Sequence, residues 1–123
     1  MKIPINYPFV GEEEIREVTS VLAEKSLTSA ANEGGKRVQQ FENLLSKFVK
    51  SKYAIAVNSG TSALQASLYA MDIKSGDEVL IPSFTFVATA NSVKSVGAKP
   101  VFVDILKENY KTNESNNSSS FVW

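Results

Sequence analysis

The first half of the chain carries apolar residues at the spacing of amphipathic helices. One stripe follows three consecutive glutamates at 12–14, and a second begins after a run of small and polar residues. Apolar positions that recur every three or four residues lie on one helix face. The stripes consist of Ile15, Val18, Val21 and Leu22, and of Val38, Phe41, Leu44, Leu45, Phe48 and Val49. They predict helices over about 12–25 and 38–50, with an extended arm before them (1–11) and a loop between them (26–35).

The second half alternates short apolar runs with helical segments. Three runs are predicted to be buried strands, at 53–57, 78–81 and 100–105. A helix at 60–72 is apolar around much of its circumference, so we expect it to be buried on more than one side. A second helix, at 86–97, should end with Gly97 as a left-handed cap, because Pro100 follows closely. Strands that alternate with helices predict an α/β fold with a mostly parallel sheet.

Composition narrows the chemistry that the chain can perform with its own residues. Its 123 residues suffice for one ordinary domain, and 43% hydrophobic and 21% charged residues are typical of globular proteins. Thirteen basic residues balance thirteen acidic ones, so no net charge attracts nucleic acid or an anionic membrane. The absence of cysteine and histidine excludes disulfides, thiol catalysis, Ser-His-Asp catalysis and the commonest metal ligands. We therefore predict no metal site and, without a signal segment or a run of about 18 apolar residues, a cytoplasmic location.

The residues at 57–64 form one candidate binding motif, where a predicted strand is followed by a helix. Unpaired backbone N–H groups and the helix dipole make such a start attractive to anions. Gly60 would let a phosphate approach the backbone closely, and Thr61 and Ser62 add hydroxyl donors. The alternative is that Ser59 merely caps the helix. The motif is neither a P-loop nor GxGxxG, and its residues alone leave both interpretations open.

The residues at 81–91 form a second candidate motif, at the carboxyl end of another predicted strand. Open α/β sheets bind ligands at this edge. Phe84 and Phe86 alternate there with hydroxyl residues, and a ring such as Phe86 could stack on a planar heterocycle. The alternative, which these residues alone favour, is that both rings pack in the core at a helix entry.

Together, the two motifs resemble the DegT/DnrJ/StrS family of sugar aminotransferases, and the likeness extends from Ile5 to about Asn113. The resembling segments are the arm and first helix at 8–15, the loop and second helix at 26–29 and 38–42, the turn at 58–64, and the strands and helix at 76–86 and 97–105. The resemblance implies the N-terminal part of the large domain of an aspartate-aminotransferase-like (type I pyridoxal-phosphate) fold, three-layered, with a mostly parallel sheet, and truncated.

The resemblance also implies a cofactor and its contacts. Backbone amides matching Thr61 and Ser62, after Gly60, would hold the phosphate of pyridoxal 5′-phosphate, and the ring matching Phe86 would stack on its pyridine. Such enzymes pass an amino group, usually from glutamate or glutamine, to a nucleotide-linked keto sugar. They work as homodimers, and Thr28 matches a loop near the shared site.

The family's catalytic residues have no counterparts here. The aspartate that pairs with the pyridine nitrogen and the lysine that forms the Schiff base would fall beyond residue 123. None of the lysines present matches that position, so we assign no catalytic residue and expect the chain alone to be inactive.

The end of the chain departs from the family pattern. Residues 109–120 are rich in asparagine and serine with little to bury, and an apolar Phe-Val-Trp stub follows. We interpret this as a truncated or frameshifted coding sequence with a foreign terminus after about residue 116. The predicted organisation is an arm, helix and loop (1–35), a partial cofactor-binding α/β domain (36–112) and a disordered or aberrant tail (113–123). An incomplete sheet would leave apolar surface uncovered, so we expect poor solubility.

Two other functions fit the same residues. A small domain could hold a phosphorylated ligand at the Gly60 turn without chemistry. Alternatively, the two N-terminal helices could form a dimerisation module that pairs with full-length homologues.

Overall fold

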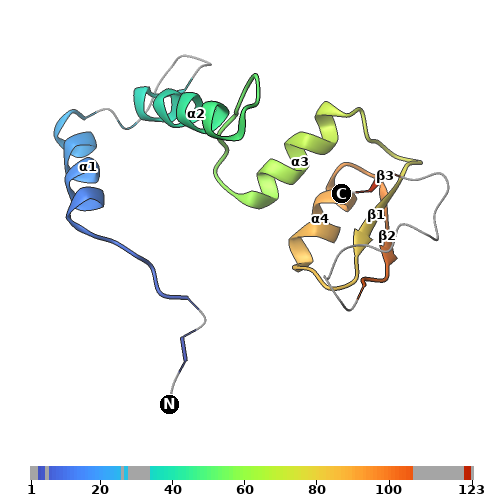
Figure 1. The fold of residues 1–123 in the computed structure, drawn as a ribbon. Helices are drawn as coiled ribbons and strands as arrows, with labels where there is room; N and C mark the ends of the chain where they lie inside the picture. Colours follow the sequence, from blue (N-terminus) through green and yellow to red (C-terminus); the bar gives the residue numbers. More distant parts are fainter. Residues whose placement is uncertain (1–2, 5, 26, 28–33, 107–120, 123) are drawn as a thin grey trace. The chain divides into compact units, whose positions relative to one another are not determined.

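The computed structural model describes residues 3–4, 6–25, 27, 34–106 and 121–122 (Figure 1). Most of the predicted loop at 26–35, Thr28 included, and the polar segment at 109–120 lie outside the described residues. The chain divides into two compact units, Met1–Ala56 and Val57–Trp123, and each is described by itself. The predicted boundary between residues 35 and 36 lies inside the first unit.

The first unit contains the two predicted helices, α1 (Glu12–Ala23) and α2 (Lys36–Val49). Gly11 precedes α1, and its backbone N–H donates to the Glu14 side chain at 2.7 Å, which satisfies one of the unpaired donors of the first turn. The helix α2 ends at Lys50, whose φ of 56° is left-handed. Neither helix buries a residue, so the apolar stripes that predicted them are largely exposed.

The Glu14 cap makes the start of α1 sensitive to acid. The hydrogen bond from Gly11 lowers the pKa of Glu14 below its ordinary value of 4.5. Because the pKa of Glu14 is lower in the folded state, its ionised carboxylate stabilises the folded state at pH values above the ordinary pKa. This stabilisation is lost as the pH falls through the folded-state pKa. We expect the Gly11 amide NMR shift to titrate with a midpoint below 4.5. The Glu14→Gln variant should abolish this titration, whereas a midpoint at or above 4.5 would contradict the expectation.

Arg37 is the side chain that connects α1 with α2. Its guanidinium lies 3.1 Å from Glu17 and 3.5 Å from Glu24, and it donates to the Ser20 hydroxyl at 3.2 Å. The backbones of the two helices do not pack against each other in the described part of the unit. The side chains of these ion pairs are roughly half exposed, and ion pairs of this kind contribute only about 0–1 kcal/mol.

The strand predicted at 53–57 is wrong. The segment is irregular, and Ile55 is 82% exposed. Two of its backbone groups bond to side chains instead: the Ser51 hydroxyl donates to the Tyr53 carbonyl at 2.7 Å, and the Ala56 N–H donates to Glu42 at 2.7 Å. An apolar run becomes a strand only where a neighbouring strand takes up its backbone hydrogen bonds. No described strand pairs with this one.

The second unit confirms the other predicted helices and strands. It contains α3 (Gly60–Ala70), β1 (Glu78–Pro82), α4 (Val87–Ser95), β2 (Lys99–Val103) and a short β3 (Phe121–Val122). The strands β1 and β2 run parallel, paired from Glu78↔Lys99 to Pro82↔Val103, with α4 as the connection between them (Figure 1). Parallel strands joined by a helix form the βαβ unit that the alternating pattern predicted.

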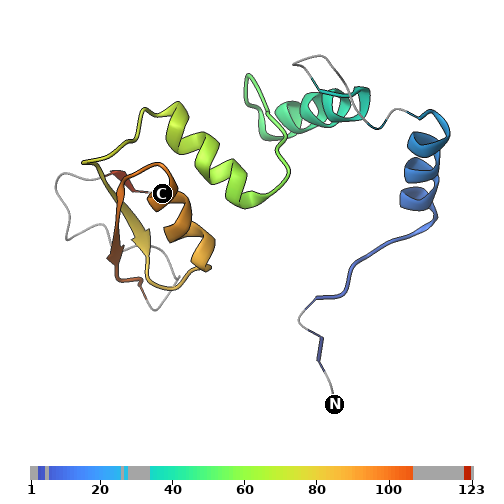
Figure 2. The same ribbon diagram turned by 180° about the vertical axis from the view of Figure 1, so that it is seen from behind.

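The core of the second unit lies between β1 and the helices. Val79 and Ile81 of β1 pack with Val93 of α4 and Leu68 of α3, all at most 2% exposed. Viewed from behind, α3 lies beside α4 (Figure 2). The expectation that the helix at 60–72 is buried on several sides is wrong, because Leu68 is the one buried residue of α3. Further covering elements would be needed to bury its remaining apolar side chains.

The strand β3 was not anticipated from the sequence. Phe121 and Val122 lie in the segment predicted to be a disordered or aberrant tail, yet they pair in parallel with Val79 and Leu80 of β1. The described sheet therefore has the order β2-β1-β3. The strand β3 pairs with only two positions of β1, which continues to Pro82.

Gly97 is required by its backbone conformation. It follows the end of α4 with a φ of 85°, as predicted for a left-handed cap, and its N–H donates to the Lys94 carbonyl at 3.0 Å. We expect Gly97→Ala to lower the free energy of unfolding by about 1–2 kcal/mol, because a Cβ disfavours this region. Urea titration followed by circular dichroism would measure the change. Gly60→Ala is the matched control, because Gly60 has no positive φ, and equal effects would contradict the prediction.

Candidate functional site

The predicted site residues lie at the starts of two helices in the second unit. Gly60, Thr61 and Ser62 form the first turn of α3, and Phe86 is the N-cap residue immediately before α4. Both helix starts follow directly from the sequence, since Ser59 is a strong N-cap residue and residues 83–85 form a bend after β1. The two helices pack against each other, so the turn and the ring belong to one structural assembly.

Ser59 caps α3, which confirms the capping interpretation of this turn. Its Oγ accepts a hydrogen bond from the Ser62 backbone N–H at 3.1 Å and lies 3.0 Å from the Ser62 Oγ. The Ser62 hydroxyl donates to the Asn58 side chain at 2.7 Å. A phosphate that used the Ser62 amide would have to share it with Ser59. Capping and phosphate binding are compatible, because a helix start carries more than one free N–H.

Gly60 leaves the space in front of this turn open. A Cβ built at Gly60 would meet no heavy atom within 4 Å, and the residue itself is exposed. The amides of Gly60 and Thr61 belong to the first turn, where no intrahelical acceptor is available. The dipole of the eleven-residue helix adds partial positive charge at the same place. The turn is therefore accessible to an anion, and helix starts of this kind can bind phosphate groups.

Phe86 projects from the protein and does not pack in the core. Its side chain is 77% exposed, so the core-packing alternative is wrong for this ring. The hydroxyls of Thr85, just before Phe86, and of Thr89, three residues after it, are hydrogen-bonded to each other at 2.9 Å. A ring held at a helix start with an open face can stack on a planar ligand.

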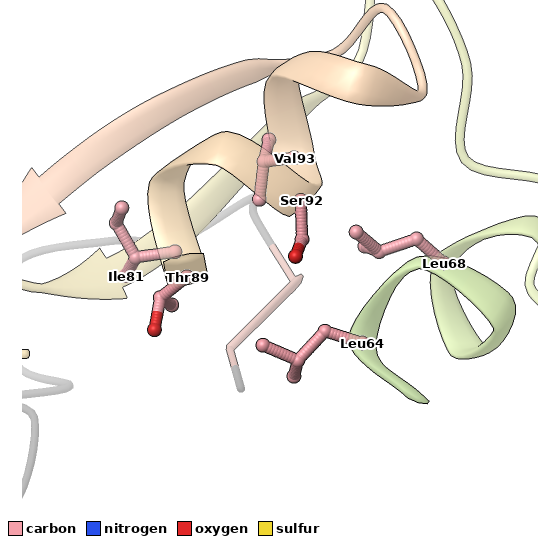
Figure 3. A pocket seen from close by; sticks show the side chains of 6 residues that line it. All are labelled: Leu64, Leu68, Ile81, Thr89, Ser92 and Val93. Carbon is pink, nitrogen blue, oxygen red and sulfur yellow. The ribbon is translucent and has the colours of Figure 1, made fainter. Parts of the chain in front are cut away.

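A small apolar cavity lies between side chains of α3, α4 and β1 (Figure 3). It has a volume of about 20 Å³ and is lined by Leu64, Leu68, Ile81, Thr89, Ser92 and Val93. A space of this size holds roughly one water molecule. It is too small for a cofactor, so any ligand of the turn would lie outside it, in front of Gly60.

Ser92 is a residue of this region that sequence reasoning missed. It is fully buried, and its hydroxyl points from α4 toward α3 (Figure 3). A serine within a short, weakly amphipathic helix carries no distinguishing pattern. The signal that could have drawn attention to it is a polar residue flanked by Val93 and Val96 on the buried side of the helix.

Two negative observations concern the described residues alone. None of their helices is long and apolar enough to cross a membrane. Nor do three acidic side chains among them gather closely enough to hold a metal ion.

Comparison with known proteins supplies the context for this geometry. The model of the DegT/DnrJ/EryC1/StrS aminotransferase family matches residues 8–117. The spore coat polysaccharide biosynthesis protein SpsC of Bacillus subtilis is 46% identical over 103 residues, covering 84% of this chain and 25% of SpsC. GDP-perosamine synthase of Escherichia coli O157:H7 is 34% identical over 113 residues, covering 92% of this chain and 30% of the synthase. The chain thus spans about a quarter to three tenths of the length of these relatives.

The solved structures agree with the sequence matches. Spr1654 of Streptococcus pneumoniae, assigned as a sugar aminotransferase and solved in a pyridoxal-phosphate form, superposes with a TM-score of 0.80 at 30% identity. The match covers 92% of this chain and 28% of that protein. The same protein in its pyridoxamine-phosphate form gives the same TM-score. The chain therefore has the fold of the matching part of these aminotransferases, as the sequence resemblance implied.

Proposed function

Because the chain belongs to the DegT/DnrJ/EryC1/StrS aminotransferase family, whose cofactor is pyridoxal phosphate, we propose that it is the cofactor-holding part of a sugar aminotransferase. The observation that carries the proposal is the open turn at Gly60. A helix start with unpaired amides and no atom in front of its glycine is suited to a phosphate.

In this proposal each site residue has a separate task. The amides of Gly60 and Thr61, with that of Ser62 shared with Ser59, hold the phosphate, and the exposed Phe86 ring covers one face of the pyridine. When bound, pyridoxal phosphate carries an amino group between donor and acceptor. These residues bind and orient the cofactor but transfer no proton, because none has a suitable titratable group.

The wider activity rests on the relatives. They include GDP-perosamine synthase and a UDP-linked keto-glucuronate aminotransferase, so we propose amino-sugar biosynthesis with a nucleotide-linked keto sugar as acceptor and glutamate or glutamine as donor. A cytoplasmic homodimer is part of the same proposal. The 123-residue chain should be inactive alone, because no lysine in it matches the family's catalytic position.

Binding of pyridoxamine 5′-phosphate tests the proposal directly. This form has no aldehyde, so it cannot react with surface lysines. We expect its fluorescence to change on binding, with an affinity at least about tenfold higher than that of pyridoxamine, since hydrogen bonds to a charged phosphate contribute about 1.5–3 kcal/mol. Equal affinities for the two compounds, or no binding of either, would refute the phosphate site.

One observation favours a second candidate function. The apolar face of α2 is exposed at Phe41, Leu44 and Phe48, as a dimerisation module would require. Co-purification with full-length SpsC would support this role. Leu44→Asp should then abolish the association and leave pyridoxamine phosphate binding intact.

A further inference from the structure

Ser92 is a buried polar side chain in an otherwise apolar core. It is 0% exposed and lies beside Leu68 and Val93. Burial of a hydroxyl is costly unless it is hydrogen-bonded, and an alanine would fill much of the same space without that requirement. The hydrogen-bond partners of this hydroxyl therefore need to be identified.

The two acceptors of this hydroxyl lie in the two halves of the proposed cofactor site. The Ser92 Oγ donates to the carbonyl of Ala88 at 2.8 Å and makes a longer contact of 3.4 Å with the carbonyl of Thr61. Ala88 lies in the first turn of α4, two residues after Phe86. Thr61 lies in the first turn of α3, next to Gly60. The Ser92 hydroxyl thus links the backbone next to the Phe86 ring with the backbone of the phosphate-binding turn.

We propose that Ser92 is a positioning residue that sets the separation between the phosphate-binding turn and the Phe86 ring. The inference rests on the proposed function of that turn and ring. A phosphate and a pyridine ring are joined at a fixed distance within one molecule, so both contacts form together only if the two helix starts are held at the matching separation. Ser92 holds them from the core side and touches neither ligand group.

The chain offers a control in Ser95, an exposed residue where Ser92 is buried. It lies on the same helix, and its hydroxyl also donates to a backbone carbonyl within α4, that of Ser92, at 2.7 Å. Within the described part of the chain, its side chain makes no hydrogen bond to α3. Ser95→Ala therefore removes a side-chain hydrogen bond within α4 and leaves the contact between α4 and α3 in place. Ser92→Ala removes a hydrogen bond within α4 and also the contact with α3.

The test compares two ligands in the full 123-residue chain. Inorganic phosphate uses the turn alone, and pyridoxamine 5′-phosphate uses the turn and the ring. We expect Ser92→Ala to weaken pyridoxamine phosphate binding about two- to tenfold, the range of an aromatic contact, with phosphate affinity by ³¹P NMR unchanged within about twofold. Ser95→Ala should leave the ratio of the two affinities unchanged, and Ser92→Thr, which keeps the hydroxyl, should restore it. Equal losses for both ligands, or no loss, would overturn the inference.

Hydrogen exchange without ligand separates this inference from the proposed function. If Ser92 links the helix starts, Ser92→Ala should speed exchange of the hydrogen-bonded amides of Ser62 and Ala63 in α3 and of Thr89 in α4 more than Ser95→Ala does, with α2 unchanged. Similar exchange in the two variants would overturn the link even if the wild type binds the cofactor. Conversely, a wild type that does not prefer pyridoxamine phosphate to pyridoxamine refutes the proposed function, and the exchange result still decides whether the link exists.

Discussion

Replacing Ile81 by alanine is expected to lower the free energy of unfolding of the Val57–Trp123 unit by about 2–5 kcal/mol. Ile81 of β1 is 0% exposed, and it packs in the cluster that joins β1, α3 and α4. The existing cavity beside it would grow, because the surrounding side chains already leave a space there. Since small domains are stable by only about 5–15 kcal/mol, this loss is a large fraction of the stability of the unit. Urea titration, with hydrogen exchange of the β1 amides as the readout, would measure the loss of free energy of unfolding.

Ile55→Ala is the matched control for this experiment. It removes the same atoms from a side chain that is 82% exposed, so the free energy of unfolding should change by less than about 0.5 kcal/mol. Comparable effects of the two substitutions would show that the core does not lie between β1 and the helices. A large effect of Ile55→Ala alone would instead show that 53–57 is packed as a strand.

A methyl group at position 60 should remove cofactor binding without harming the fold. We expect Gly60→Ala to lower the affinity for pyridoxamine 5′-phosphate at least about tenfold, because the added Cβ projects into the space where a phosphate would contact the backbone. The helix should persist, since alanine favours helix more than glycine does and nothing lies within 4 Å of the new atom. Fluorescence titration measures binding, and circular dichroism measures helix content.

Gly35→Ala provides the control for position 60. Gly35 also lies at a helix start, as the N-cap of α2 in the other unit. A Cβ at this position would also meet no heavy atom within 4 Å. Its substitution should leave pyridoxamine phosphate binding unchanged. If Gly60→Ala bound the ligand as tightly as the wild type, the phosphate could not lie against this turn.

The elements that sequence predicted correctly are those specified by nearby residues. Glu14 caps the start of α1, Ser59 caps the start of α3 and Gly97 ends α4, and each acts within a few residues along the chain. The site residues were placed at helix starts for the same reason. Local signals of this kind survive in a part of a fold, because they need no distant partner.

The elements that sequence did not predict depend on distant partners. The run at 53–57 has the composition of a strand but lacks a neighbour, whereas Phe121 and Val122 gain one in β1 some forty residues away. The contact between Ser92 and Thr61 spans 31 residues and has no motif. Pairing and burial of this kind are set by tertiary structure, which apolar periodicity does not encode.

The Arg37 connection has a consequence for how the first two helices behave in solution. Since the Arg37 ion pairs link α1 to α2, dissolved ions compete with this link. The screening distance falls from about 10 Å at 0.1 M ionic strength to about 3 Å at 1 M, which is comparable to the contacts that Arg37 makes. The link between these two helices should therefore weaken as the ionic strength of the buffer rises.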